Sequence, residues 1–99
     1  MNIRVHSIHF NADVKLLDFI KEKIDRLIHF DERITGGDVY LKLDKARNAE
    51  NKIVQVKLNV PGHNIFTKYQ CRTFEEATDL CVDTLSQLIK KRKERKYGR

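Results

Sequence analysis

The sequence predicts a small α+β domain with a four-stranded mixed sheet and both helices packed on one face of it. Two stretches place apolar residues at helical spacing, and four stretches alternate apolar and polar side chains as half-buried strands do. The order along the chain is β-α-β-β-β-α. Because every element has one apolar side, a single two-layer arrangement can bury them all. No linker or internal repeat divides the 99 residues, so we expect one domain, 1–99.

The first strand is expected over residues 2–8 and the first helix over residues 13–29. Ile3 and Val5 alternate with polar neighbours, and Asp13 is a favourable N-cap residue. A helical crossover allows the first strand to lie parallel beside a strand that comes later in the chain. The apolar face of this helix comprises Leu16, Leu17, Ile20, Ile24, Leu27 and Ile28.

Three further strands are expected at 39–45, 52–60 and 64–71, joined by short turns as an antiparallel meander. Gly36-Gly37 and Pro61-Gly62 are turn signals. In the second strand Val39, Leu41 and Leu43 are expected to point inward. Alternation then leaves an outer sheet face that meets water or a partner, with Tyr40, Lys42, Gln55, Lys57, Phe66 and Lys68.

The last helix is expected over residues 73–96. Thr73 and Glu76 have the spacing of a capping box. Its apolar stripe comprises Phe74, Ala77, Cys81, Val82, Leu85, Leu88 and Ile89. At 100° per residue, Arg92 falls on the azimuth of Phe74 and Leu85, where a packed helix would need an apolar side chain. We therefore expect the helix to be docked up to about Ile89 and to continue as a basic C-terminal arm, residues 90–99.

The whole net charge of the protein lies in that arm. Lys90–Arg99 holds seven of the 20 Lys and Arg residues and one of the 14 Asp and Glu residues, a net charge of +6. The remaining residues carry 13 basic and 13 acidic groups. One or two cations would suffice to complement the helix dipole. The excess predicts an arm that binds a polyanion, and Lys45 and Arg47 of the 45–51 loop are further candidates.

The sequence offers little that suggests catalysis. It has no glycine-rich phosphate loop and neither a G-x-S-x-G nor an H-E-x-x-H pattern. A Cys–His pair is left open, although nothing places Cys71 or Cys81 near a histidine. We expect two reduced, at least partly buried thiols, and the four histidines do not have metal-ligand spacing. The prediction is no enzyme, no cofactor, no metal and no small-molecule substrate.

Nucleic acid is the favoured polyanion. No apolar run reaches the ~18 residues of a membrane span, and no signal-peptide pattern is present, so a cytoplasmic protein is expected. Lys90–Lys96 lacks the apolar face that membrane-surface helices need. The tail order α-β-β-β-α is shared with double-stranded RNA-binding domains. Glu75 and Glu76 would repel phosphate at the helix end that those domains use.

The whole chain resembles the ribosome hibernation promoting factor family, also called the ribosome-associated inhibitor or sigma-54 modulation family. The resemblance rests on the element order, on LLDFIKEKIDRLIHF (16–30) and on LSQLIKKRKERK (85–96). It implies a translation inhibitor that occupies the tRNA and mRNA channel of the small ribosomal subunit in idle ribosomes. The implied partners are the 30S subunit, the 70S ribosome and 16S rRNA, and the isolated protein is expected to be a monomer.

The resemblance also implies which residues contact rRNA phosphates. The matching positions are Lys90, Lys91, Arg92, Lys93, Arg95 and Lys96 in the last helix and Lys21, Lys23 and Arg26 in the first. Where relatives often carry cations earlier in the last helix, this chain has Thr84 and Gln87. It ends at Arg99 and so resembles the short form of the family. Two alternatives stay open: a protein-interaction module that regulates transcription, and a general structured-RNA-binding domain.

Overall fold

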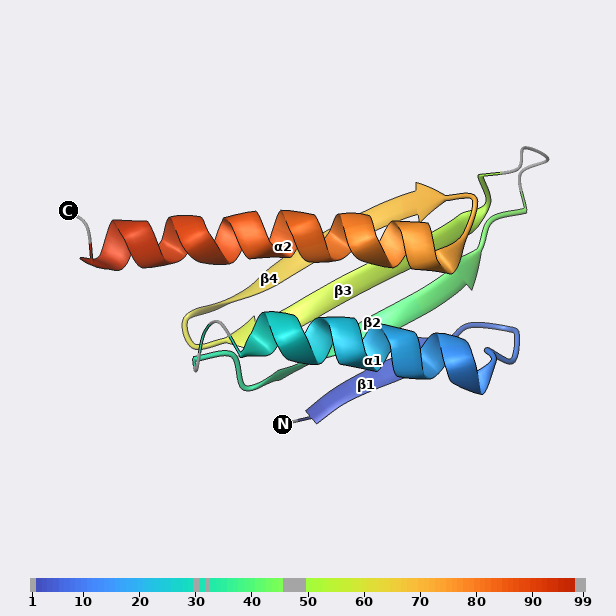
Figure 1. The fold of residues 1–99 in the computed structure, drawn as a ribbon, viewed down its shortest axis with the longest axis horizontal. Coiled ribbons are helices and arrows are strands. Elements are labelled where there is room, and N and C mark those ends of the chain that lie inside the picture. Colours follow the sequence, from blue (N-terminus) through green and yellow to red (C-terminus); the bar gives the residue numbers. More distant parts are fainter. Residues whose placement is uncertain (1, 30, 32, 46–49, 98–99) are drawn as a thin grey trace.

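The protein has two layers, a four-stranded sheet and a pair of helices lying across one of its faces (Figure 1). The computed structural model describes residues 2–29, 31, 33–45 and 50–97, without the side chains of residues 2, 63 and 92–97. The elements are β1 (Asn2–Ser7), α1 (Val14–Ile28), β2 (Gly36–Leu43), β3 (Lys52–Val60), β4 (His63–Cys71) and α2 (Phe74–Tyr97).

The strand order in the sheet is the same as the order in the chain, β1-β2-β3-β4. β1 is parallel to β2, with Val5 paired to Val39. The two following pairs are antiparallel, so β2, β3 and β4 form a meander. The parallel pair follows from the α1 crossover, which returns the chain to the same end of the sheet. The predicted fold class, a mixed sheet with both helices on one face, is confirmed.

The core lies between the two layers and is made by the apolar sides of all six elements. From the helices it receives Ile20, Ile24, Leu27, Ile28, Phe74, Ala77, Cys81, Leu85 and Ile89, and from β2 and β3 it receives Val39, Leu41, Val54, Val56, Leu58 and Val60. Ile3, Val5, Leu16, Leu17 and Val82 are partly buried against them. The helical and strand periodicities therefore identified the core faces correctly.

Two apolar residues that were predicted to point into the core are partly exposed to solvent. Leu43 is 46% exposed, because it forms the last pair of the β2–β3 ladder with Lys52, at the end of the sheet. Leu88 is 37% exposed, although it lies on the apolar stripe of α2. Leu88 directly precedes Ile89, the last buried side chain of α2 among those that the structure describes. Periodicity reports the direction of a side chain but not the extent of the layer opposite it.

The Gly36-Gly37 pair does not form the expected turn. Both glycines are buried and begin β2, where Gly36 pairs with Asn59 and Gly37 with Leu58. An added Cβ at Gly37 would lie 2.5 Å from the carbonyl oxygen of Lys57 and 2.9 Å from Leu58 Cδ2. The second glycine is therefore required by a close approach of two strands.

The two helices begin differently. The Thr73 hydroxyl oxygen accepts a hydrogen bond of 3.0 Å from the backbone N–H of Glu76, which is the first half of the predicted capping box. Asp13 occupies the N-cap position of α1 as expected, but its side chain makes no capping hydrogen bond. Its backbone carbonyl accepts the first helical bond, from Leu17.

Both cysteines are free thiols and are buried, as expected. Cys81 Sγ lies 3.5 Å from the carbonyl oxygen of Val54, to which it donates. Burial, with a smaller contribution from Cys71, raises the pKa of Cys81 to about 12. Burial also raises the pKa of Cys71, with help from the nearby carboxylates of Glu76 and Glu50.

Replacing Gly37 by alanine should lower the free energy of unfolding by about 1–3 kcal/mol, because the new methyl group forces β2 and β3 apart. Urea denaturation followed by circular dichroism measures the change. Asn64→Ala, at an exposed position of β4, is the matched control and should change the stability by less than about 0.5 kcal/mol. An unchanged midpoint for G37A would contradict the close strand approach.

The thiols should be almost inert in the folded protein near neutral pH. The thiolate is the reactive form, and a pKa of about 12 leaves very little of it at Cys81. A thiol-specific disulfide reagent should label both cysteines in guanidinium chloride and neither at a comparable rate in buffer. Native labelling of Cys81 as fast as that of free cysteine would contradict its placement in the core.

Candidate nucleic-acid interface

The predicted basic arm begins where the packing of α2 ends. Ile89 is buried, and Lys90 and Lys91 directly after it are exposed. The helix backbone continues to Tyr97 and extends past the edge of the sheet (Figure 1). This extension makes the molecule long, with principal extents of 47 × 25 × 20 Å. The side chains of Arg92, Lys93, Arg95 and Lys96 lie outside the described part, as does Arg47, whereas Lys45 is exposed.

The other half of α2 has the opposite charge. Glu75, Glu76, Asp79 and Asp83 are all exposed. Carboxylates near a helix N-terminus and cations near its C-terminus both complement the helix dipole. The same distribution makes the two ends of α2 unequal toward an anion, since phosphate would be repelled along the first half and attracted along the last.

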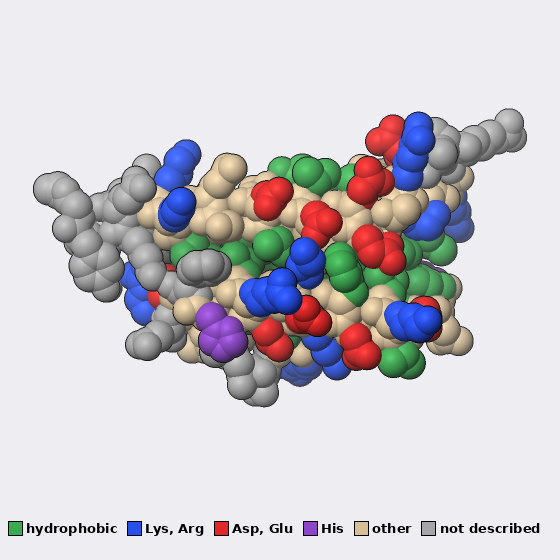
Figure 2. Space-filling model, viewed as in Figure 1, with side chains coloured by type: hydrophobic (Ala, Val, Ile, Leu, Met, Phe, Trp, Pro, Cys, Tyr) green, Lys and Arg blue, Asp and Glu red, His purple; other side chains and the backbone are tan. Residues whose placement is uncertain are grey.

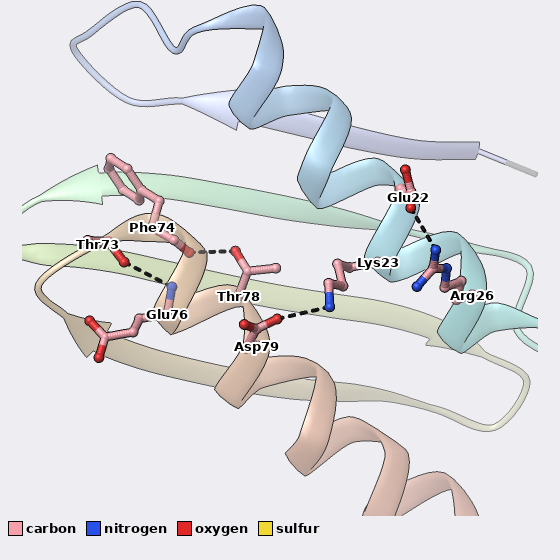
Figure 3. A network of polar contacts seen from close by, with 8 residues as sticks. All are labelled: Glu22, Lys23, Arg26, Thr73, Phe74, Glu76, Thr78 and Asp79. Carbon is pink, nitrogen blue, oxygen red and sulfur yellow. Dashed lines mark hydrogen bonds and ion pairs between the residues drawn. The ribbon is translucent and has the colours of Figure 1, made fainter.

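The three candidate cations of α1 differ in their surroundings. Lys23 Nζ lies 3.3 Å from a carboxylate oxygen of Asp79 on α2, and 5.5 Å from the centre of the Phe19 ring. Arg26 donates a 2.8 Å hydrogen bond to Glu22, one turn earlier (Figure 3). Lys21 is exposed and makes no ion pair with another described residue. The structure thus places two of these three cations in ion pairs within the helix layer.

Acidic and basic side chains alternate over the surface formed by the two helices (Figure 2). Exposed ion pairs of this kind contribute about 0–1 kcal/mol each. An RNA phosphate, which forms strong charge-assisted hydrogen bonds with Arg and Lys, can therefore replace Glu22 or Asp79 as the partner at little cost. The ion pairs of Lys23 and Arg26 are compatible with a binding role.

Thr84 and Gln87, where the family resemblance leads one to expect cations, differ in their surroundings. Thr84 is half-buried, and its hydroxyl lies 2.6 Å from the Tyr69 hydroxyl of β4. This contact helps to fix α2 on the sheet. Gln87 is exposed. Thr84 therefore has a packing role in this chain.

The outer face of the sheet holds a charged cluster that the sequence analysis did not find. Asp38 on β2 lies 3.0 Å from His6 Nε2 and 3.8 Å from Arg4 Nε, both on β1. The His6 ring stacks on Tyr40, with 4.9 Å between the ring centres. The hydrogen bond from His6, and then the charges of Arg4, His6 and Lys57, hold the pKa of Asp38 below its ordinary value of 3.8, against the opposing effect of desolvation. Only the strand register brings these residues together.

The described part of the chain lacks the features of two other kinds of site, a metal centre and a membrane-spanning helix. It contains no group of three His, Cys, Asp or Glu side chains placed to hold a metal ion. No helix there is both long and apolar enough to cross a lipid bilayer. The exposed cations at the end of α2 remain the principal candidate for a binding site.

The fold and this site define a small two-layer α+β domain that carries exposed cations where its last helix leaves the core. Residues 3–97 match the sequence model of the family described as sigma 54 modulation protein / S30EA ribosomal protein. The chain belongs to this family.

Two relatives bear closely similar names. The ribosome hibernation promoting factor of Pseudomonas putida is 28% identical over 99 residues, which is 99% of this chain and 92% of that protein. The ribosome hibernation promotion factor of Deinococcus radiodurans is 33% identical over 79 residues, which is 79% of this chain and 41% of that longer protein.

Solved structures share the fold. A ribosomal subunit interface protein from Coxiella burnetii superimposes with a TM-score of 0.81 at 19% identity, covering 94% of this chain and 98% of that one. The N-terminal domain of Thermus thermophilus Protein Y gives a TM-score of 0.78 at 20% identity, covering 92% and 98%. At these identities the likeness concerns the fold alone.

Removing the Asp38 carboxylate should destabilise the protein in a pH-dependent way. Because the pKa of Asp38 is lowered on folding, its ionised form stabilises the folded state above about pH 4. That contribution is lost as the pH falls through the folded pKa. Asp38→Asn should therefore reduce the free energy of unfolding at pH 7, measured by urea denaturation, by up to about 1 kcal/mol. The difference from the unaltered protein should shrink toward pH 3.

Asp18→Asn is the control, because Asp18 is an exposed carboxylate on α1 that makes no ion pair with another described residue. Its urea midpoint should follow that of the unaltered protein at both pH values. If the loss of stability in D38N grew as the pH fell, the ionised Asp38 carboxylate would not be the form that stabilises the fold.

Proposed function

We propose that this protein is a ribosome hibernation factor, a non-enzymatic translation inhibitor that binds the small ribosomal subunit. The proposal rests mainly on the change in α2 at Ile89, where a buried apolar stripe gives way to exposed Lys90 and Lys91. Family membership supports the proposal. So do the names of relatives in Pseudomonas putida and Deinococcus radiodurans.

The proposed mechanism is stoichiometric occupation of the tRNA and mRNA channel of an idle ribosome. The two-layer body serves as a rigid wedge, and residues 90–99 form a basic arm that engages phosphates of 16S rRNA. Because α2 is one helix from Phe74 to Tyr97, no hinge separates the arm from the core. A phosphate contact made by the arm therefore fixes the orientation of the whole body.

The proposed rRNA contacts extend to α1. Lys21 is available directly, whereas Lys23 and Arg26 would exchange Asp79 and Glu22 for phosphates. The complete set is Lys90, Lys91, Arg92, Lys93, Arg95 and Lys96 of α2 with Lys21, Lys23 and Arg26 of α1. We further propose that the isolated protein is a cytoplasmic monomer that requires no cofactor, metal or small-molecule substrate.

The first experiment is sedimentation of the purified protein with ribosomes and separated subunits at several salt concentrations. Neutralising about six phosphates gives a slope of log affinity against log salt of about −4 to −5. Replacing Lys90, Lys91, Arg92 and Lys93 by alanine should weaken binding to the small subunit and make that slope shallower by about 3. The variant should remain folded, because these residues follow Ile89, the last buried residue among the described side chains of α2.

A charge-matched control uses cations at the other end of the molecule. The pair Lys52→Ala and Arg72→Ala should change ribosome binding far less than the pair Lys90→Ala and Lys91→Ala. Equal losses for the two pairs would indicate attraction by net charge alone and would contradict a specific arm. Sedimentation with bulk RNA in preference to the small subunit would favour a general RNA-binding domain.

A further inference from the structure

The outer face of the sheet combines cations with aromatic rings, of which Phe66 is exposed and His6 and Tyr40 are half-buried. Each strand contributes one cation to it, Arg4, Lys42, Lys57 and Lys68, and the strand register places His6, Tyr40 and Phe66 between them. Phe66 is 56% exposed on β4. Both helices lie on the opposite face of the sheet (Figure 1), so these side chains are not part of the core.

The charge of this face is positive after its own ion pairs are counted. Asp38 is already surrounded by His6, Arg4 and Lys57. Asp44, beyond the end of β2, accepts a 2.8 Å hydrogen bond from Gln70. Lys42 and Lys68 make no ion pair with another described residue. Seven carboxylates lie along α1 and the first half of α2. The sheet face is therefore more attractive to an anion than that part of the helix layer.

Tyr40 and Phe66 lie far enough apart for each ring to stack on a different nucleotide base. Gln55 pairs with Tyr40, and the neighbouring outward residue of β3, Lys57, pairs with Phe66. Tyr40 and Phe66 are thus two strands and two residues apart, a distance of about 12 Å for ordinary strand spacing. A few unstacked nucleotides can cross that distance, with Lys57 between the two rings.

An open cleft continues this face around the edge of the sheet. It has a volume of about 340 Å³ and is lined by Ile3, Arg4, Val5, His6, Leu17 and Lys21. Arg4, His6 and Lys21 are basic, and the other three are apolar, so no carboxylate is among the lining residues. Because Arg4 and His6 belong to both regions, the cleft and the outer face form one surface.

We propose that this surface, from the Lys21 cleft across Tyr40 to Phe66, binds a single-stranded segment of the same RNA that the arm holds. Single-stranded RNA offers unpaired bases that stack on aromatic side chains and phosphates that Lys and Arg bind. A duplex hides its bases from such rings. The cores of protein interfaces are depleted of charged residues, whereas here cations stand between the rings.

The inference rests on the proposed function in one respect, because the arm supplies the anchoring. Two or three rings and a small positive charge give weak binding to free single strands. Once the arm holds the RNA, a nearby unpaired segment is present at high effective concentration. Phe66 lies close after the β3–β4 turn, at the end of the sheet past which α2 extends (Figure 1).

The test compares two labelled RNAs that share one hairpin, of which one also carries an unpaired pyrimidine tail of about eight nucleotides. The unaltered protein should bind the tailed RNA about tenfold more tightly than the blunt one. The double variant Tyr40→Thr and Phe66→Thr should bind both equally, to within about twofold. Threonine keeps the strand propensity of these two positions on the outer sheet face.

Two control variants separate the contributions. Lys90→Ala with Lys91→Ala should weaken the binding of both RNAs by the same factor and keep the preference for the tailed RNA. Loss of the arm contact and loss of the sheet contact therefore give different results. Leu80→Gln, which removes an exposed apolar side chain from α2 (42% exposed), should change neither. Equal binding of the two RNAs by the unaltered protein, or an undiminished tail effect in the threonine variant, would overturn the proposal.

A second measurement uses the unaltered protein and does not depend on any variant folding. Photo-crosslinking from 4-thiouridine in the tail should label peptides of β2 and β4 that contain Tyr40 and Phe66. Crosslinks confined to α2 would overturn the proposal.

Discussion

The packing of α2 on the sheet is the interaction on which the rest of the structure depends. Its stripe from Phe74 to Ile89 closes the core over β3 and β4, and the buried Thr78 hydroxyl is satisfied by a 2.7 Å hydrogen bond to the Phe74 carbonyl (Figure 3). The Tyr69–Thr84 contact adds a polar link to β4. Because the helix is fixed up to Ile89, the exposed Lys90 and Lys91 that follow have a defined place relative to the body.

Charge is sorted by layer as well as along the chain. The residues before the arm are neutral in sum, yet the first half of α2 is acidic and the outer sheet face carries a cation on every strand. Lys23 and Asp79 form an ion pair between the two helices (Figure 3). A domain built this way can offer anions two separate surfaces, the helix end and the sheet, while the carboxylates in the first half of α2 repel them.

The sequence predicted the elements and their inward faces well, because each signal is local. The helical spacing of Ile20, Ile24 and Leu85 and the alternation along β3 required no knowledge of partners. The sequence predictions were wrong where the structure of a residue depends on another part of the fold. The glycine pair predicts a turn, because the close contact of Gly37 with β3 is not visible in the chain. Alternation predicts an inward Leu43, because the chain does not show that the sheet ends there.

The sequence by itself determined the fold class, the apolar faces and the concentration of charge after Ile89, because periodicity and net charge are sums over nearby residues. Only the tertiary structure decided that β1 pairs with β2, that Asp38 meets His6, and that Lys21 shares a cleft with Arg4. These contacts join residues far apart in the chain, and their alignment is set by the register and packing of the whole domain.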